Sequence, residues 1–192
     1  MSEQKSIQLI PNAEFINTFD LSSREVSAVL PHEHTKALQG ISAQKEALRQ
    51  VVKDKVDVTG GDDWHDGAFR VTDNQANIIH ERIGTLLTYV NASIVDYPLA
   101  DEERVTLGSR VTVQQGNDSF PVDVVAFSDS AEEIIDPESG DEVLSATLQS
   151  PLAKALFGKL IDSQIEYTTG ARTIKARIVA INQEAVRKQF SE

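Results

Sequence analysis

Apolar positions recur at helical spacing along the first half of the chain. A helix is predicted from about residue 35 to residue 58, because apolar residues there are separated by three, four or seven positions. These residues are Leu38, Ile41, Leu48 and Val52. The glycine pair at residues 60–61 ends this helix, since glycine is frequent just beyond a helix C-terminus.

A second helix is predicted to follow the short acidic turn at residues 62–67 and to run to about Val95. Its apolar residues form a heptad-like seam over roughly 26 residues. The seam consists of Phe69, Ala76, Ile79, Ile83, Leu86, Val90 and Ile94. Two seamed helices joined by a short turn predict an antiparallel helical hairpin, or coiled coil, in residues 35–100.

The hydrophobic period changes from helical to alternating after Val105, which predicts a domain with a small sheet. Strands are expected at residues 105–107, 110–113, 122–127, 143–148, 164–167 and 173–181. Between them a helix is expected from Pro151 to Phe157, with Ser150 as its N-cap and Gly158 at its end. The fold class is therefore α+β, with a hairpin in residues 35–100 and an α+β domain in residues 101–192.

Residues 1–34 are predicted to form an N-terminal extension without an assigned function. Within this extension, Ser22 and Ser23 are expected to cap a helix that runs through Leu30 and stops at Pro31.

The charge balance limits the kinds of partner that the chain can bind. The formal net charge is −12, and such a surface repels duplex nucleic acid, so no independent binding to duplex DNA is expected. No apolar run is long enough to span a bilayer, and the N-terminus does not lead into a signal-peptide core. Cysteine is absent, which excludes disulfides and thiolate metal sites. A cytoplasmic protein is expected, without a membrane partner.

The acidic turn contains the main candidates for metal chemistry, Asp62, Asp63 and Asp66. Mg²⁺ prefers hard oxygen ligands and often keeps several waters, so one or two aspartates can complete a site that another protein largely supplies. The alternative is a solvated turn whose carboxylates favour the N-terminus of the second helix. In the same turn, Trp64 either stacks on a nucleic-acid base or packs against the rest of the turn. His65 either donates a hydrogen bond or has no role.

Two further sets of residues have a functional and a structural interpretation. Lys45, Arg49 and Lys53 follow one another at four-residue steps and form a basic stripe on the first helix. The stripe either contacts RNA phosphates or is an exposed helix face. His32 and His34 flank Glu33, and because no third ligand is evident, a surface location is favoured over a metal site.

Residues 147–159 (TLQSPLAKALFGK) resemble the signature of the C-terminal domain in the GreA/GreB family of bacterial transcription elongation factors. The likeness continues backwards into residues 105–113, which are similar to the family's first strands, and forwards into a final hairpin at residues 165–181. With the helical hairpin in its expected place, the resemblance covers roughly residues 35–182.

The resemblance implies a fold and a mechanism. The C-terminal domain is expected to be FKBP-like and to bind bacterial RNA polymerase through Ser150, Pro151 and Leu152. The hairpin is expected to enter the polymerase's secondary channel, where Asp62 and Asp66, with Asp63, help to hold a catalytic Mg²⁺ near the 3′ end of backtracked RNA. The chain would then be an accessory factor rather than an enzyme, because the polymerase itself hydrolyses the RNA.

The tip of the hairpin departs from the family pattern, which usually reads Gly-Asp-Leu-x-Glu-Asn-x-Glu-Tyr. Here residues 61–69 read GDDWHDGAF, so Asp62 matches the family aspartate while His65 takes the usual glutamate position. Two functions therefore stay open, a factor that stimulates cleavage and a channel binder that regulates or inhibits transcription without cleavage. A third, prolyl isomerisation, is disfavoured because an aromatic content of 6% does not suit an aromatic-lined pocket.

Overall fold

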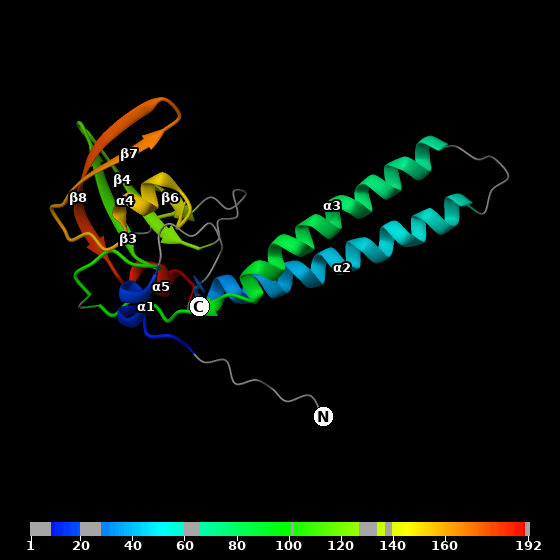
Figure 1. The fold of residues 1–192 in the computed structure, drawn as a ribbon, viewed down its shortest axis with the longest axis horizontal. Coiled ribbons are helices and arrows are strands. Elements are labelled where there is room, and N and C mark those ends of the chain that lie inside the picture. Colours follow the sequence, from blue (N-terminus) through cyan, green and yellow to red (C-terminus); the bar gives the residue numbers. More distant parts are fainter. Residues whose placement is uncertain are drawn as a thin grey trace. The chain divides into compact units, whose positions relative to one another are not determined.

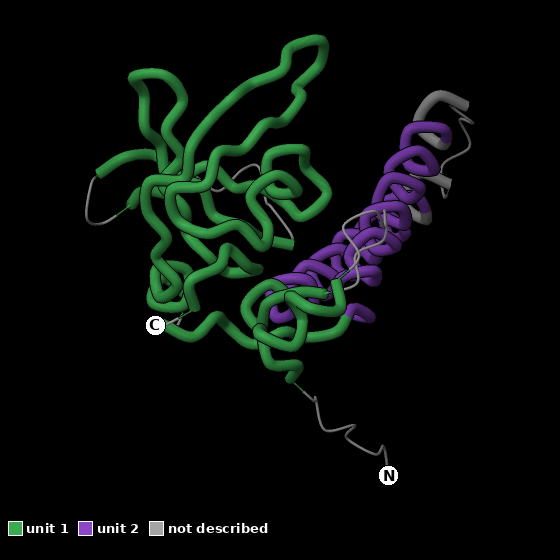
Figure 2. The backbone as a smooth tube through the Cα atoms, turned by 60° about the vertical axis from the view of Figure 1, so that its left-hand side comes forward, with its two compact units in different colours: residues 1–33, 93–192 green, residues 34–92 purple. Residues whose placement is uncertain are grey.

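The computed structural model describes residues 9–19, 28–59, 66–100, 102–126, 134–136 and 140–190, and the side chains of residues 56–59 and 66–69 are excluded from that description. The chain forms two compact units (Figure 2). One unit is the helical segment of residues 34–92, and the other combines residues 1–33 with residues 93–192. The predicted N-terminal extension is therefore part of the same unit as the C-terminal domain.

The helical unit is the expected hairpin, built from α2 (Pro31–Thr59) and α3 (Asp66–Val90), which lie side by side in Figure 1. Along both helices, buried or half-buried residues recur at alternating steps of four and three, as in a coiled-coil seam. On α2 they are Ala37, Ile41, Gln44, Leu48, Val51 and Lys55, and on α3 they are Ala76, Ile79, Ile83, Leu86 and Val90.

The predicted hairpin needs three corrections. Leu38 and Val52 are 45% and 53% exposed, because the α2 seam runs through the residues immediately before them. Helix α3 ends at Val90, and Ile94 is instead buried in strand β2 (Ser93–Ile94). Pro31 begins a helix rather than stopping one, since proline is favoured at the first helical position.

Gly40 shows how closely the two helices approach each other. A glycine inside a helix costs roughly 1 kcal/mol relative to alanine. Here a Cβ atom at Gly40 would lie 3.0 Å from Cδ1 of Leu86, so the glycine leaves room for the leucine to pack directly on the α2 backbone. The local cost at Gly40 is offset by the packing of a large side chain across the seam.

Replacing Leu86 with alanine is expected to destabilise the hairpin by about 2 kcal/mol, because the leucine packs in the seam. The measurement is chemical denaturation followed by helical circular dichroism. Leu87→Ala is the matched control, since the neighbouring Leu87 is 42% exposed and its loss should cost less than about 0.5 kcal/mol. Equal losses for the two variants would show that the seam has been placed on the wrong face.

The second unit contains a six-stranded mixed sheet with the strand order β5-β6-β4-β3-β8-β7. Strand β6 pairs in parallel with β4, and all other neighbours are antiparallel. The strands are β3 (Arg110–Gln115), β4 (Asp118–Val125), β5 (Ile134–Ile135), β6 (Glu142–Thr147), β7 (Gln164–Thr169) and β8 (Arg172–Asn182). Helix α4 (Pro151–Leu156) contacts β6 and β7. The expected α+β class is confirmed.

One predicted strand of this unit is wrong. Residues 105–107 do not form a strand, although Val105 and Leu107 are fully buried. Their alternation with Thr106 suggested one buried and one exposed face, but Thr106 is also buried because its hydroxyl hydrogen-bonds to Asn12.

Segments from both ends of the sequence complete the second unit. Strand β1 (Ala28–Val29) pairs in parallel with β2, and residue 28 had been expected in a helix. Helix α1 (Asn12–Thr18) places Phe15 against Phe157 of the α4 C-cap, with 6.0 Å between the ring centroids. Helix α5 (Ala185–Phe190) follows β8. No helix in the described ranges has the length and apolarity needed to cross a membrane.

Candidate functional site

Helix α4 contains the residues predicted to bind a partner. The Ser150 hydroxyl accepts a hydrogen bond of 3.2 Å from the backbone N–H of Ala153, so it caps the helix as expected. Ala153 and Leu156 are fully buried and hold the inner face of the helix on the sheet. Pro151 is exposed and Leu152 is half-buried, so the N-terminal end of α4 presents an apolar surface on a fixed support.

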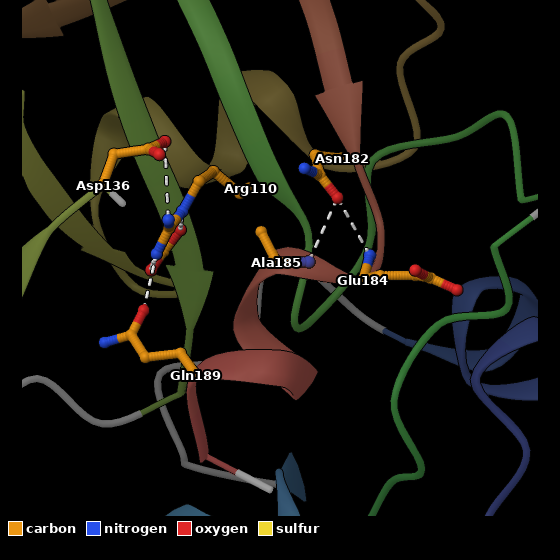
Figure 3. A network of polar contacts seen from close by, with 7 residues as sticks. Arg110, Asp136, Asn182, Glu184, Ala185 and Gln189 are labelled. Carbon is orange, nitrogen blue, oxygen red and sulfur yellow. Dashed lines mark hydrogen bonds and ion pairs between the residues drawn. The ribbon is translucent and has the colours of Figure 1, made fainter. Parts of the chain in front are cut away.

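The sheet of this unit contains a buried ion pair. Arg110 on β3 and Asp123 on β4 are 4% and 1% exposed, and they form two hydrogen bonds of 2.7 and 2.9 Å. Arg110 also donates to Gln189 of α5 at 2.6 Å and lies 3.5 Å from Asp136 (Figure 3). Although burial opposes the charge, the hydrogen bonds to Asp123 raise the pKa of Arg110, so the guanidinium stays charged.

The first turn of α2 contains a second buried charge. Glu33 is 1% exposed, and its carboxylate accepts hydrogen bonds from the backbone N–H groups of Leu30 at 2.7 Å and Ala126 at 2.8 Å. Sequence reasoning missed this role, since Glu33 was considered only as a residue between two histidines. Its buried partner is 93 positions away, and no local pattern identifies such a pair.

The structure places His32 within a set of aromatic contacts. His32 is half-buried and its ring stacks on Phe190 at 3.9 Å, so it is not the surface residue that was expected. Its Nδ1 shares a hydrogen bond of 2.8 Å with the hydroxyl of Tyr97. Among the described residues, no three acidic, histidine or cysteine side chains are grouped as metal ligands.

Tyr97 is expected to ionise late in an alkaline titration. Burial raises the pKa of Tyr97 to about 12, above the ordinary value of about 10. The unfolded chain therefore loses this proton first, and folding stability should fall as the pH rises from about 10 to about 12. Absorbance at 295 nm should show one of the three tyrosines ionising near pH 12. This late step should vanish in Tyr97→Phe, and ionisation of all three tyrosines near pH 10 would contradict it.

The sheet has an open depression of about 530 Å³ on strands β3, β7 and β8. Its polar lining includes Gln114, Gln164, Glu166, Lys175 and Arg177, and no aromatic residue lines it. An apolar, aromatic-lined pocket for prolyl isomerisation is therefore not found at this place. None of the residues predicted from the sequence to form a site lies in this depression.

The candidate site residues that were predicted on the hairpin lie in the helical unit, whereas α4 lies in the other unit. Lys45, Arg49 and Lys53 are exposed on α2, and Arg49 forms an exposed ion pair of 2.9 Å with Glu46. The tip residues Asp62, Asp63, Trp64 and His65 lie outside the described residues. Asp66 is the first residue of α3, and its side chain is also outside the description.

Comparison with known proteins assigns the C-terminal part of the chain. Residues 100–183 match the family described as "Transcription elongation factor, GreA/GreB, C-term". This part of the chain is therefore similar to the C-terminal domain of Gre factors. The match contains α4 and all the strands from β3 to β8, and it ends just before α5.

The likeness to a curated relative extends over most of the chain. The chain is 25% identical over 165 residues to the transcription elongation factor GreA of Syntrophomonas wolfei, which corresponds to 84% of this chain and 99% of the relative. Among solved structures, it is similar to the GreA factor homolog 1 (Gfh1) protein of Thermus thermophilus, with 22% identity, 83% and 99% coverage of the two chains, and a TM-score of 0.36. It is also similar to the GreA/GreB factor of Nitrosomonas europaea, with 18% identity, 81% and 98% coverage, and a TM-score of 0.32.

Proposed function

We propose that this chain is a transcription elongation factor that binds bacterial RNA polymerase and inserts its helical hairpin into the secondary channel. There it stimulates the Mg²⁺-dependent cleavage of backtracked RNA by the polymerase. The observation that carries this proposal is the match of residues 100–183 to the GreA/GreB C-terminal domain, in a chain that also contains a helical hairpin.

The exposed end of α4 suits the role of a docking surface. The inner residues Ala153 and Leu156 hold the helix on the sheet, and the Ser150 cap fixes its first turn. Pro151 and Leu152 are then available to contact a partner without any rearrangement of the domain. Apolar residues on a rigid support are efficient anchors, because little conformational freedom is lost on binding.

The hairpin supplies the second part of the proposed mechanism. The basic stripe of Lys45, Arg49 and Lys53 is exposed along α2, where it can contact RNA phosphates. At the tip, Asp62 and Asp66 would add carboxylate oxygens to a Mg²⁺ ion that the polymerase largely supplies. Such an ion stabilises the charge that develops on the phosphate during hydrolysis.

Binding to core RNA polymerase is tested with the full chain and one charged variant. Wild type should be retained by the polymerase at micromolar concentration, and Pro151→Glu should lower the affinity at least about tenfold, because a desolvated, unpaired charge costs more than about 1.4 kcal/mol. Glutamate in the first turn favours a helix N-terminus, so α4 should stay folded. Gln164→Glu is the matched control, since it adds the same charge in the depression. If wild type is not retained, the proposed function is wrong.

A second function is supported by one feature of the sequence. His65 stands where the family usually has a glutamate, so the tip has fewer carboxylates in their usual places. A factor with such a tip would occupy the channel and compete with other channel factors without stimulating cleavage. Both functions require polymerase binding, and only a cleavage assay on stalled elongation complexes separates them.

A further inference from the structure

Helix α5 lies just outside the residues that match the GreA/GreB domain. The GreA/GreB match ends at residue 183, and α5 begins at Ala185. The side-chain oxygen of Asn182 accepts hydrogen bonds from the backbone N–H groups of Glu184 at 3.2 Å and Ala185 at 3.1 Å, which starts the helix (Figure 3). With six residues, α5 is too short to be stable alone, so its contacts with the rest of the unit must hold it in place.

These contacts reach the place where the hairpin begins. Val186 is fully buried, Gln189 accepts a hydrogen bond from Arg110, and Phe190 stacks on His32 with an angle of 6° between the rings. His32 is the second residue of α2, and its hydrogen-bond partner Tyr97 follows β2 after the hairpin. Through His32, α5 therefore touches both segments that connect the hairpin to this unit, residues 28–33 and 93–98, which we call the root.

The contacts of α5 can be lost without leaving a buried charge unpaired. Arg110 keeps its two hydrogen bonds to Asp123 when Gln189 leaves. His32 keeps its hydrogen bond to Tyr97 when Phe190 leaves. The root also keeps its own link to the sheet, because Glu33 accepts hydrogen bonds from Leu30 and Ala126 without α5. Release of α5 exposes the buried Val186 but leaves these hydrogen bonds of Arg110, His32 and Glu33 in place.

We propose that α5 is a reversible strap over the root of the hairpin. When it is bound, Phe190 restrains the first turn of α2 through His32. When it is released, the root is held by the Glu33 hydrogen bonds, the pairing of β1 with β2 and the bond between His32 and Tyr97. The strap would control how freely the root moves, and this role does not depend on whether the chain stimulates RNA cleavage.

Amide hydrogen exchange on the full chain tests the strap. Phe190→Ala should raise the exchange rates of root amides at least tenfold, while amides of β3 and β4 keep their wild-type rates. Phe190→Tyr retains an aromatic ring and should behave as wild type. Lys188→Ala changes a side chain of the same helix that is 74% exposed, and it should also leave the root unchanged.

Two results would overturn this proposal. Unchanged root exchange in Phe190→Ala would show that the stack does not restrain the root. A similar acceleration in β3 and β4 would show that α5 is an integral part of the core rather than a strap. Polymerase retention by the same variants is a separate measurement, so failure of the strap and failure of the proposed function can be distinguished.

Discussion

Replacing Asp123 with alanine should lower the free energy of unfolding of the sheet-containing unit by about 3–5 kcal/mol. The substitution leaves the guanidinium of Arg110 at 4% exposure without its bidentate partner. Asp136 at 3.5 Å and Gln189 at 2.6 Å compensate only in part, since Asp136 is more distant and Gln189 is neutral. The measurement is a denaturant titration in which unfolding of the sheet-containing unit is monitored by circular dichroism.

Two comparisons isolate the effect of the buried charge. Glu46→Ala breaks the exposed pair with Arg49, whose side chains are 72% and 78% exposed, and should cost less than about 1 kcal/mol. The double variant Arg110→Met with Asp123→Leu removes both charges and should recover much of the loss, because no buried ion is left unpaired. If Asp123→Ala were as mild as Glu46→Ala, the buried pair would contribute no more to stability than an exposed one.

Substitution of Asp62 by asparagine should reduce Mg²⁺-dependent cleavage of backtracked RNA by on the order of 10- to 100-fold, the range seen when groups that support a metal are removed. An amide is neutral and is a poorer ligand than a carboxylate for a hard cation. Folding and polymerase binding should be spared, because the variant changes only a polar residue of the predicted turn. The measurement is the cleavage rate of stalled elongation complexes against Mg²⁺ concentration.

The neighbouring aspartates provide the internal comparison for Asp62. Asp63→Asn or Asp66→Asn should have a comparable effect only if that side chain is the second ligand of the metal. If wild type binds the polymerase and stimulates no cleavage, the activator proposal is replaced by the inhibitor proposal. If wild type and Asp62→Asn are equally active, the metal mechanism at the tip is excluded while the family assignment remains.

The sequence predicted the elements that depend on local patterns. Helix α4 was expected from a serine cap followed by proline, and the structure confirms the cap. The hairpin was also expected, but its α2 seam was placed partly on the wrong residues. Leu38 and Val52 are apolar and exposed, while the seam contains Gln44 and Lys55, so hydrophobicity alone misplaces the face. Lys55 is in the seam because it forms an ion pair with Asp73 at 2.6 Å.

Contacts between distant segments could not be predicted from one sequence. Asn12 is buried because its side chain donates to the backbone oxygens of Asp96 and Leu107. Glu33 is buried because its side chain accepts a hydrogen bond from the N–H of Ala126, which directly follows β4. Both residues are polar, so composition suggests exposure for each. Their burial is decided by partners that the local sequence does not reveal.

Only part of the candidate site could be predicted from the sequence. The α4 residues could be named because a capped helix is recognisable from consecutive residues. The role of α5 could not, since Phe190 and His32 are 158 positions apart and nothing in either neighbourhood indicates a stack. The aspartates of the tip remain a prediction.

The sheet-containing unit is discontinuous in the sequence, and this has a consequence for the order of folding. Residues 1–33 leave the ribosome before their partners in residues 93–192 have been made. The hairpin emerges between them, and its helices can pair at once, as in the contact between Lys55 and Asp73 only 18 positions apart. A folded antiparallel hairpin returns the chain close to its starting point. The later pairing of Ala28 with Ser93 then avoids most of a loop-closure entropy on the order of 3 kcal/mol or more. We therefore expect the hairpin to act as an intramolecular template during synthesis, so that seam variants such as Leu86→Ala also slow the pairing of β1 with β2.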